Sequence, residues 1–331
     1  MKAAAAGTDA FTPTLTITAP ALRRGRTTLG DAGLMLMRAL LLCLAMGSAL
    51  AQTPSPTLAK LRHSGVITLG YRTASVPFSY LGAQLQPIGF TMDICQRVIE
   101  HLRRQPGLAD LEVRLMAVTS GTRLPLVANR TVDIECGITT NTAERARNVG
   151  FSLTYFVAES RLLSKRSRPI PDVDALRGLA VASTIGTTSI QLLHELNRER
   201  GLNLRILAGL DDVDSIRLLD SDQAVAFAMD DVLLRGLLAS ARKPEHYSVS
   251  ELALSVEPYG LPLPPNDPEF KRLVDEALRE LFRSGEIHSL YKRWFQTAVP
   301  PQGVNLNLPM PAAMLRVLKE PTDSPDPEKY R

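Results

Sequence analysis

The sequence is poor in the residues and motifs that build most catalytic and metal centres. It has five histidines, and none of them stands at the spacing of a metal-ligand pair. It has no Gly-x-Ser-x-Gly turn, no glycine-rich phosphate loop and no His-Glu-x-x-His helix. We therefore expect no catalytic residues, no metal ion and no cofactor. The single tryptophan, Trp294, is interpreted as a packing residue.

Charge of one sign is also scarce outside the N-terminus. The formal net charge is +4 over 331 residues. Residues 1–51 hold five basic and two acidic side chains, a surplus of three, so residues 52–331 carry only +1. A nearly neutral body lacks the basic patch with which proteins bind a phosphate backbone, and we expect no nucleic-acid partner.

Long hydrophobic runs are missing as well. The apolar run after Arg38 covers residues 39–46, whereas a membrane helix needs about 20 apolar residues. A positive residue, a short apolar run and the small residues at 47–51 form the pattern of a secretory signal. We predict that residues 1–51 are an export segment cleaved near Ala51 and that the mature chain is periplasmic. Met35 and Met37 are left open as alternative starts.

Cysteine, which can crosslink the chain covalently, is also rare. Only three occur, and Cys43 falls within the export segment. Cys95 and Cys136 belong to the exported part, where a disulfide can form. Because the sequence does not fix the distance between them, we favour the interpretation that they are two separate small residues in the core.

What the chain does contain is a repeated alternation of strand and helix patterns after a linker at 52–57. Strands are predicted at 66–70, 111–118 and 132–136, and again, after a break at 168–172, at 179–183, 204–207 and 224–228. Helices are predicted at 58–63, 90–104, 122–129, 188–200, 214–220, 232–240, 267–283 and 286–295. This rhythm is typical of an α/β fold with parallel sheets.

Two extended segments, at 155–164 and 247–256, lie between the alternating units. We predict two lobes joined by two strands, with a ligand cleft between the lobes. The first lobe is predicted to take residues 58–160 and 255–298, and the second to take residues 161–254. The proline-rich residues 299–331 are predicted to form a tail that lies over the surface.

Three arginines follow predicted strands of the first lobe. Arg72, Arg123 and Arg145 therefore map to the same edge of one parallel sheet, where open α/β sheets bind ligands. A guanidinium group is always charged and presents paired donors that match a carboxylate. Hydroxyl residues that can also donate to a carboxylate lie beside the arginines, namely Ser120, Thr139 and Thr140. Ser120 is open to a second interpretation, as the cap of the helix that follows it.

The second lobe offers the complementary groups. Thr187 and Thr188 lie in a segment between a strand and a helix, and such a helix start can receive an anion. Asp230 and Asp231 follow the strand at 224–228. We assign Asp230 to the pocket, where its carboxylate can take an ammonium group, and Asp231 to the cap of the next helix.

Several segments resemble one family. These segments are VITLGYRTASVPFSY at 66–80, TSGTRLPL at 119–126, ECGITTN at 135–141, Glu144-Arg145, and residues 186–189, 224–231 and 284–295. Together they resemble the glutamate/aspartate periplasmic binding proteins of ABC importers. The resemblance implies the type II periplasmic-binding-protein fold, in which two Rossmann-like lobes are joined by two hinge strands. It also implies a monomer that binds one amino acid and delivers it to an ABC permease in the inner membrane.

The resemblance also implies a role for each site residue. The α-carboxylate would be held by Arg145, Thr140 and Thr188, the α-ammonium by Asp230, and the side-chain carboxylate by Arg72, Ser120 and Arg123. Two residues depart from the family pattern, because Ile138 replaces a serine and Asp212 stands where a histidine is usual. An acid that faces a ligand carboxylate repels it, unless Asp212 points away or bridges to an arginine. The ligand is therefore left open between glutamate or aspartate and an amide such as glutamine or asparagine.

Two further functions stay open on this scaffold. A lyase or dehydratase would need a general acid near the ligand, and Asp212 and Glu135 are the candidates. A ligand-sensing module that docks on a membrane receptor is the other alternative.

Overall fold

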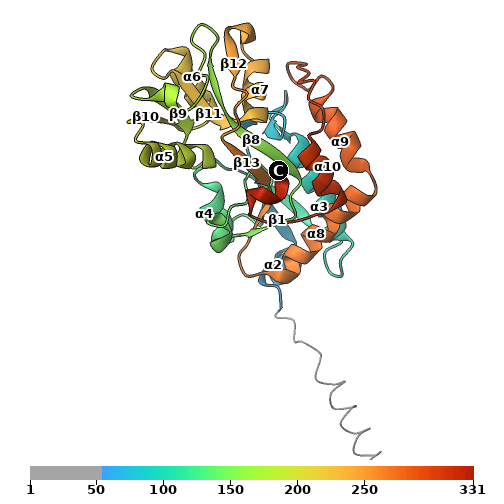
Figure 1. Cartoon of the computed structure of the whole chain (residues 1–331). Coiled ribbons are helices and arrows are strands. Elements are labelled where there is room, and N and C mark those ends of the chain that lie inside the picture. The colour runs from blue at the N-terminus through green and yellow to red at the C-terminus, as the bar shows by residue number, and fades with distance from the viewer. Residues whose placement is uncertain (1–53) are drawn as a thin grey trace, which may run out of the picture. The chain divides into compact units, whose positions relative to one another are not determined.

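The computed structural model describes residues 54–331, so the predicted export segment at 1–51 lies outside the described residues. Within 54–331, no helix combines the length and the apolar character that crossing a membrane requires. Two of the sheets in the described residues have parallel strands at their centre, and these are a three-stranded parallel sheet and a six-stranded mixed sheet (Figure 1). We call the part built around β1 the first lobe and the part built around β9 the second lobe.

The first lobe has β1 (Val66–Tyr71) at the centre of its sheet. This strand pairs in parallel with β5 (Glu112–Ala117) on one side and with β6 (Ile134–Glu135) on the other. Around the sheet lie α2 (Pro56–Ser64), α3 (Phe90–Arg103) and α4 (Arg123–Ala128), and a small antiparallel sheet of β2 (Ala74–Ser75), β3 (Ser79–Leu81) and β4 (Pro87–Ile88). Helix α2 ends at Gly65, which adopts a φ of 67° that costs glycine little.

The second lobe repeats this arrangement around β9 (Ala180–Thr184). Strands β10 (Arg205–Gly209) and β11 (Ala226–Asp230) pair with β9 in parallel, and α5 (Thr188–Arg200), α6 (Asp212–Asp220) and α7 (Asp231–Ala239) lie around them (Figure 1). Helix α5 has the predicted bounds, because Thr187 caps its start and Gly201 ends it in the left-handed region. Helix α6 begins two residues earlier than predicted, because Asp211 accepts a hydrogen bond from the Asp214 backbone and serves as its cap.

Two adjacent antiparallel strands run between the lobes. They are β8 (Phe156–Lys165) and β13 (Ser255–Tyr259), which pair with each other, and β8 also pairs with β11 and with β12 (Tyr247–Val249) of the second lobe. After β13 the chain returns to the first lobe, where β14 (Pro262–Leu263) pairs with β7 (Gly150–Phe151). Aromatic rings fill the junction, with Phe78 packed edge-on against Phe156 and Tyr259.

The two amphipathic helices near the C-terminus complete the first lobe. Helix α8 (Pro268–Arg283) packs against α3, and α9 (Glu286–Phe295) packs against both (Figure 1). Trp294 is buried, and its indole N–H donates to Asp93 at 2.7 Å. The interpretation of this tryptophan as a packing residue agrees with these contacts.

The tail, predicted only as a segment that lies over the surface, contains secondary structure of its own. It contains helix α10 (Ala312–Lys319) and the short 3-10 helix η4 (Pro327–Tyr330). Tyr330 is 2% exposed, and its hydroxyl is hydrogen-bonded to the Thr154 side chain at 2.8 Å. It packs with Val157 of β8 and Val317 of α10, so the tail is anchored on the first residues of the strand that links the lobes.

The expectation that the two exported cysteines stay separate is wrong. Cys95 of α3 and Cys136, directly after β6, form a disulfide with their Cα atoms 6.2 Å apart. The bridge ties the helix α3, which packs beside the first sheet, to the loop that follows the edge strand β6 of that sheet. The sequence could not show this pairing, because the two residues are 41 positions apart and their distance depends on how α3 packs.

Candidate functional site

The three predicted arginines are all buried at one edge of the first sheet. Arg72 directly follows β1, Arg123 is the first residue of α4, and Arg145 begins the short 3-10 helix η1 (Arg145–Arg147). Their exposed fractions are 5%, 3% and 7%, although arginine is seldom buried without a paired charge. Parallel strands end at the same edge, which explains why residues far apart in the sequence come together here.

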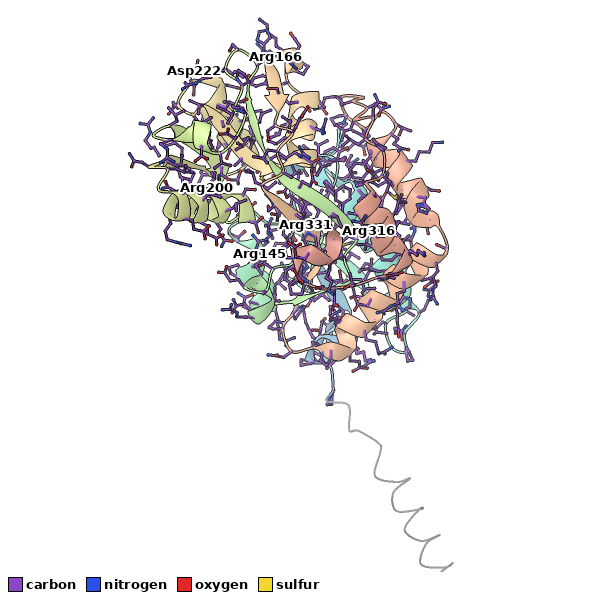
Figure 2. The ribbon with its side chains drawn as sticks, viewed as in Figure 1. Arg145, Arg166, Arg200, Asp222, Arg316 and Arg331 are labelled. Atoms are coloured by element: carbon purple, nitrogen blue, oxygen red, sulfur yellow. A yellow bond between two sulfur atoms is a disulfide. The ribbon has the colours of Figure 1, made fainter. Side chains whose placement is uncertain are left out.

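A small cavity lies between the lobes at this edge. The first lobe contributes Ser120, Arg123, Ile138 and Thr140 to its lining, and the second contributes Thr187, Thr188, Met229 and Asp230. Arg145 lies beside it and reaches across both lobes (Figure 2). One guanidinium nitrogen of Arg145 donates to the Thr140 carbonyl and the other to the Gly186 carbonyl, each at 3.1 Å.

Buried charges without an ion-pair partner gather around this cavity. Residues 54–331 contain ten buried charged side chains, and three of them, Asp133, Asp267 and Asp275, have a lysine or arginine within 4.0 Å. The other seven have no opposite charge within that distance, and they are Arg72, Arg123, Glu135, Arg145, Asp212, Asp230 and Glu257. Leaving a buried charge unpaired is costly, so the set indicates a ligand site rather than a structural ion-pair network.

Polar atoms without hydrogen-bond partners show the same clustering. Among the described residues, eight buried side-chain nitrogen or oxygen atoms have no partner, and six of them belong to this site. They are Nη1 of Arg72, Oγ of Ser120, Nε and Nη1 of Arg123, Oε1 of Glu135 and Oδ1 of Asp230. Donors dominate on the first lobe and an acceptor lies on the second, which suits a ligand that carries both carboxylate and ammonium groups.

Burial changes the acid–base properties of the arginines. Burial and the neighbouring guanidinium groups of Arg145 and Arg72 lower the pKa of Arg123 to about 9, although Glu135 opposes the shift. Burial also lowers the pKa of Arg145. Both groups still carry a positive charge at neutral pH, and their electrostatic attraction for an anion is strong because little water screens it.

Asp230 is the acceptor on the second lobe. It is the last residue of β11, one carboxylate oxygen accepts from the Tyr259 hydroxyl, and the other has no partner. Burial and the nearby carboxylate of Glu257 raise the pKa of Asp230 well above its ordinary value. An ammonium group beside Asp230 would favour its ionised form and so reverse this shift.

Two residues near Asp230 were missed by the sequence reasoning. Glu257 of β13 is buried and accepts from the Thr188 hydroxyl at 2.8 Å and from the Ser255 hydroxyl. Tyr259, on the same strand, donates to Asp230. The available signal was an acid inside an otherwise apolar strand segment, which is unusual in a core.

The other predicted residues divide into those that line the cavity and those that support it. Ser120 lines it, and its role as a helix cap is wrong, because α4 has no side-chain cap and its preceding residue is Thr122. Thr139 lies behind the cavity and donates to Glu135 at 2.7 Å. Thr187 caps α5 through the Ile190 backbone and donates to the Thr184 carbonyl.

Asp212 does not point away to solvent and does not bridge to an arginine. It is the first residue of α6, is 4% exposed, and accepts from the Thr184 hydroxyl at 2.7 Å. Its charge acts on Arg72 and Arg123 across the gap between the lobes, and burial raises its pKa. The structure therefore keeps an acid near the two arginines that were expected to hold a second ligand carboxylate.

The lobes touch each other at two glycines. A Cβ atom added to Gly186 would lie 2.7 Å from the Ser120 carbonyl oxygen, and one added to Gly236 of α7 would lie 2.4 Å from the Val76 carbonyl oxygen. Neither distance is tolerated by a real side chain, so both contacts require glycine. Backbone of one lobe thus packs on backbone of the other at both points.

Comparisons with known proteins identify a family and similar relatives. The family described as bacterial extracellular solute-binding proteins, family 3, matches residues 67–297. The L-glutamate/L-aspartate-binding protein of Pseudomonas aeruginosa is 42% identical over 290 residues, which is 87% of this chain and 96% of that protein. The glutamate/aspartate import solute-binding protein of Escherichia coli is 41% identical over 288 residues, which is 86% of this chain and 95% of that protein.

Solved structures share the fold at lower identity. A mutant of ArgBP from T. maritima has a TM-score of 0.63 at 24% identity, covering 72% of this chain and 98% of that one. An ancestral amino acid-binding protein described as a precursor of cyclohexadienyl dehydratase has a TM-score of 0.61 at 23% identity, covering 72% of this chain and 99% of that one. At these identities the likeness establishes the two-lobed fold.

Proposed function

Because the chain belongs to the bacterial extracellular solute-binding proteins, family 3, we propose that it binds an acidic amino acid, glutamate or aspartate, and delivers it to an ABC permease. The observation that carries this proposal is the set of seven buried, unpaired charges around one cavity between two lobes. Two closely similar relatives with names that specify glutamate and aspartate support the choice of ligand.

The proposed contacts follow from where each side chain lies. Arg145, Thr140 and Thr188 would hold the α-carboxylate at the start of α5, and Asp230 would hold the α-ammonium. Arg72, Ser120 and Arg123 would hold the side-chain carboxylate. A hydrogen bond to a charged group contributes about 1.5–3 kcal/mol, and micromolar affinity requires about 8 kcal/mol, so a few such bonds are enough.

Closure supplies the thermodynamic link between binding and delivery. The ligand would contact both lobes at once, so it favours the arrangement in which the lobes are close together. We place this cycle in the periplasm, with the protein acting as a monomer without catalytic activity. The alternative of a lyase gains no support from the two most similar relatives reported above, since both are named as binding proteins.

Isothermal titration calorimetry on the exported chain tests the proposal. We expect saturable one-site binding of glutamate or aspartate, found first by a thermal-shift screen of the common amino acids. Arg123→Ala and Arg145→Ala should each weaken binding by about tenfold or more, since each leaves a buried carboxylate unpaired. Arg147→Ala, at an exposed position on the same short helix, is the matched control and should bind normally. Unchanged affinity in both site variants would refute the pocket assignment.

A further inference from the structure

We infer that Asp212 takes up a proton whenever a ligand with two carboxylates binds, and that this residue sets the preference of the site between an acidic amino acid and its amide. The inference rests on the proposed function and concerns the same cavity. It starts from the number of buried charges rather than from any single contact.

The buried charges of the site do not balance. Three guanidinium groups, from Arg72, Arg123 and Arg145, face four carboxylates, from Glu135, Asp212, Asp230 and Glu257. An amide such as glutamine binds as a zwitterion and adds no net charge. Glutamate adds one negative charge and leaves a closed site with two uncompensated negative charges, which is a costly arrangement in a medium of low dielectric. Uptake of a proton by one carboxylate removes much of that cost.

Asp230 and Glu257 have tasks that favour the ionised form, whereas Glu135 and Asp212 each accept from one threonine hydroxyl and act on two arginines. Asp230 accepts from Tyr259 and faces the position proposed for the ligand ammonium. Glu257 accepts from two hydroxyl groups, those of Thr188 and Ser255. Glu135 accepts from Thr139, and its charge acts on Arg123 and Arg145.

Asp212 is the carboxylate that competes directly with the ligand. Its charge acts on Arg72 and Arg123, and these arginines are proposed to hold the second ligand carboxylate. It has no arginine nitrogen within 4.0 Å, so no ion pair holds it in the charged form. When a dicarboxylate engages the two arginines, their attraction for Asp212 is shared with the ligand, and the neutral acid becomes the favoured form.

The groups around Asp212 support this direction. On its own helix, Asp211 adds a like charge, and Ser215 is hydrogen-bonded to Thr184, the donor from β9. Asp230 of β11 adds another like charge, while Arg72 and Arg123 oppose. On its other side Asp212 lines a recess with Thr73, Tyr80 and Leu233, and Tyr80 is held neutral by burial. Burial and the like charge of Asp211 raise the pKa of Asp212, which is the direction that favours proton uptake.

Calorimetry at a fixed pH in buffers with different ionisation enthalpies measures the protons taken up on binding. Titrations of the wild-type exported chain with L-glutamate and with L-glutamine should differ by about one proton, because both ligands bring the same ammonium to Asp230 and only glutamate brings the second carboxylate. The affinity for glutamate relative to glutamine should fall as the pH is raised from 6 to 8.

Asp212→Asn provides the second arm of the test. The variant should lose the difference in proton uptake and should bind glutamate about tenfold more tightly than the wild type at pH 8, with little change for glutamine. Asp214→Asn is the matched control, because it makes the same change on the same helix at a residue paired with Arg217 at 3.0 Å. If glutamine binds too weakly to measure, the comparison of the two proteins on glutamate carries the test.

The outcomes separate this inference from the proposed function. Equal proton uptake for both ligands in the wild type would overturn the inference and leave the proposed function intact. Uptake that persists in Asp212→Asn would overturn the assignment to Asp212 and point to Glu135. Failure of every amino acid to bind would refute the proposed function, and the inference would fall with it.

Discussion

Asp230 meets two opposing requirements at one side chain. Its free carboxylate oxygen is placed to receive an ammonium group, yet its burial beside Glu257 disfavours the charged form. Such conflicts between stability and function are common at binding sites, where a group is arranged for its ligand rather than for the fold. The raised pKa of Asp230 determines how the free energy of unfolding changes with pH.

The folded-state pKa of Asp230 is raised above the unfolded value of about 3.9. The unfolded chain therefore releases this proton first, and the free energy of unfolding falls as the pH rises through the window between the two values. We expect Asp230→Asn to raise the melting temperature of the ligand-free protein at pH 7, to lose that gain below about pH 4, and to weaken amino-acid binding by at least about tenfold.

Scanning calorimetry at several pH values, with calorimetric titration, measures both effects. Asp110→Asn, at an exposed residue of the first lobe, should change neither the melting temperature nor the affinity. A variant Asp230→Asn that melts lower than the wild type, or that binds equally well, would contradict the role given to this carboxylate.

The arginines of the site could be predicted from the sequence, whereas two of its acids could not be placed. Arg72, Arg123 and Arg145 follow strands of one parallel sheet, so topology alone brings them to one edge. Glu257 lies on a linking strand, and the face it presents depends on how β13 pairs with β8. The position of Asp212 was found, but its direction depends on the bond to Thr184, which sequence spacing does not encode.

At the scale of the elements, α7 presents a glycine where a helix would ordinarily favour alanine. Gly236 lies on the face of α7 that meets Val76, and backbone approaches backbone there. Alanine is more favourable than glycine in a helix interior by about 1 kcal/mol, so the glycine has a reason in packing between the lobes.

We expect Gly236→Ala to weaken amino-acid binding by about tenfold while leaving the melting temperature of the ligand-free protein unchanged or higher. The added methyl group would overlap the Val76 carbonyl only when the lobes are close, so it favours an open arrangement. Titration calorimetry and small-angle scattering with and without ligand check this. Arg235→Ala, at an exposed position one residue earlier, is the control, and normal closure in Gly236→Ala would refute the explanation.

The disulfide connects two elements whose distance could not be predicted from the sequence. It closes a segment of 41 residues between α3 and the end of β6. In the chain-entropy description, a bridge of this span stabilises a protein by about 2–4 kcal/mol. We expect the double variant Cys95→Ser and Cys136→Ser to lose a similar amount in urea unfolding, and an unchanged unfolding midpoint would show that the bridge contributes nothing.

The elements with strong local signals were predicted well, whereas helix α10 in the tail was not predicted. Helix α5 has a capping threonine, a helical spacing of apolar residues and a final glycine, and its bounds match the prediction. Helix α10 has only eight residues and lies among prolines, so its local signal is weak. Its burial arises from contacts with β8, more than 140 positions earlier in the chain.

At the scale of the whole described chain, the last residues brace the strand that connects the lobes. Tyr330 packs on Val157 of β8, and the Thr154 backbone donates to the Thr322 carbonyl at 2.8 Å. Arg316 of α10 donates to the Tyr330 carbonyl at 2.7 Å, and Figure 2 shows this arginine near Arg331. We call residues 312–331 the strap. Its contacts therefore stabilise the strand about which the lobes would move.

We expect Tyr330→Ala to lower the free energy of unfolding by about 3–5 kcal/mol, because it removes a buried ring and its two hydrogen bonds. Urea unfolding measures the loss. Lys329→Ala, at the exposed neighbouring residue, should unfold at the wild-type midpoint. A normal midpoint for Tyr330→Ala would mean that the strap is only loosely attached.

The bridge between Cys95 and Cys136 also bears on how the protein is produced for study. A host cytosol keeps thiols reduced, so material made there would lack the bond until it is oxidised. Cys136 is followed directly by Gly137 and Ile138, and Ile138 lines the cavity. A preparation from a reducing compartment is therefore expected to contain molecules with and without the bond next to this loop. Affinities should be compared only between batches whose free thiols have been titrated.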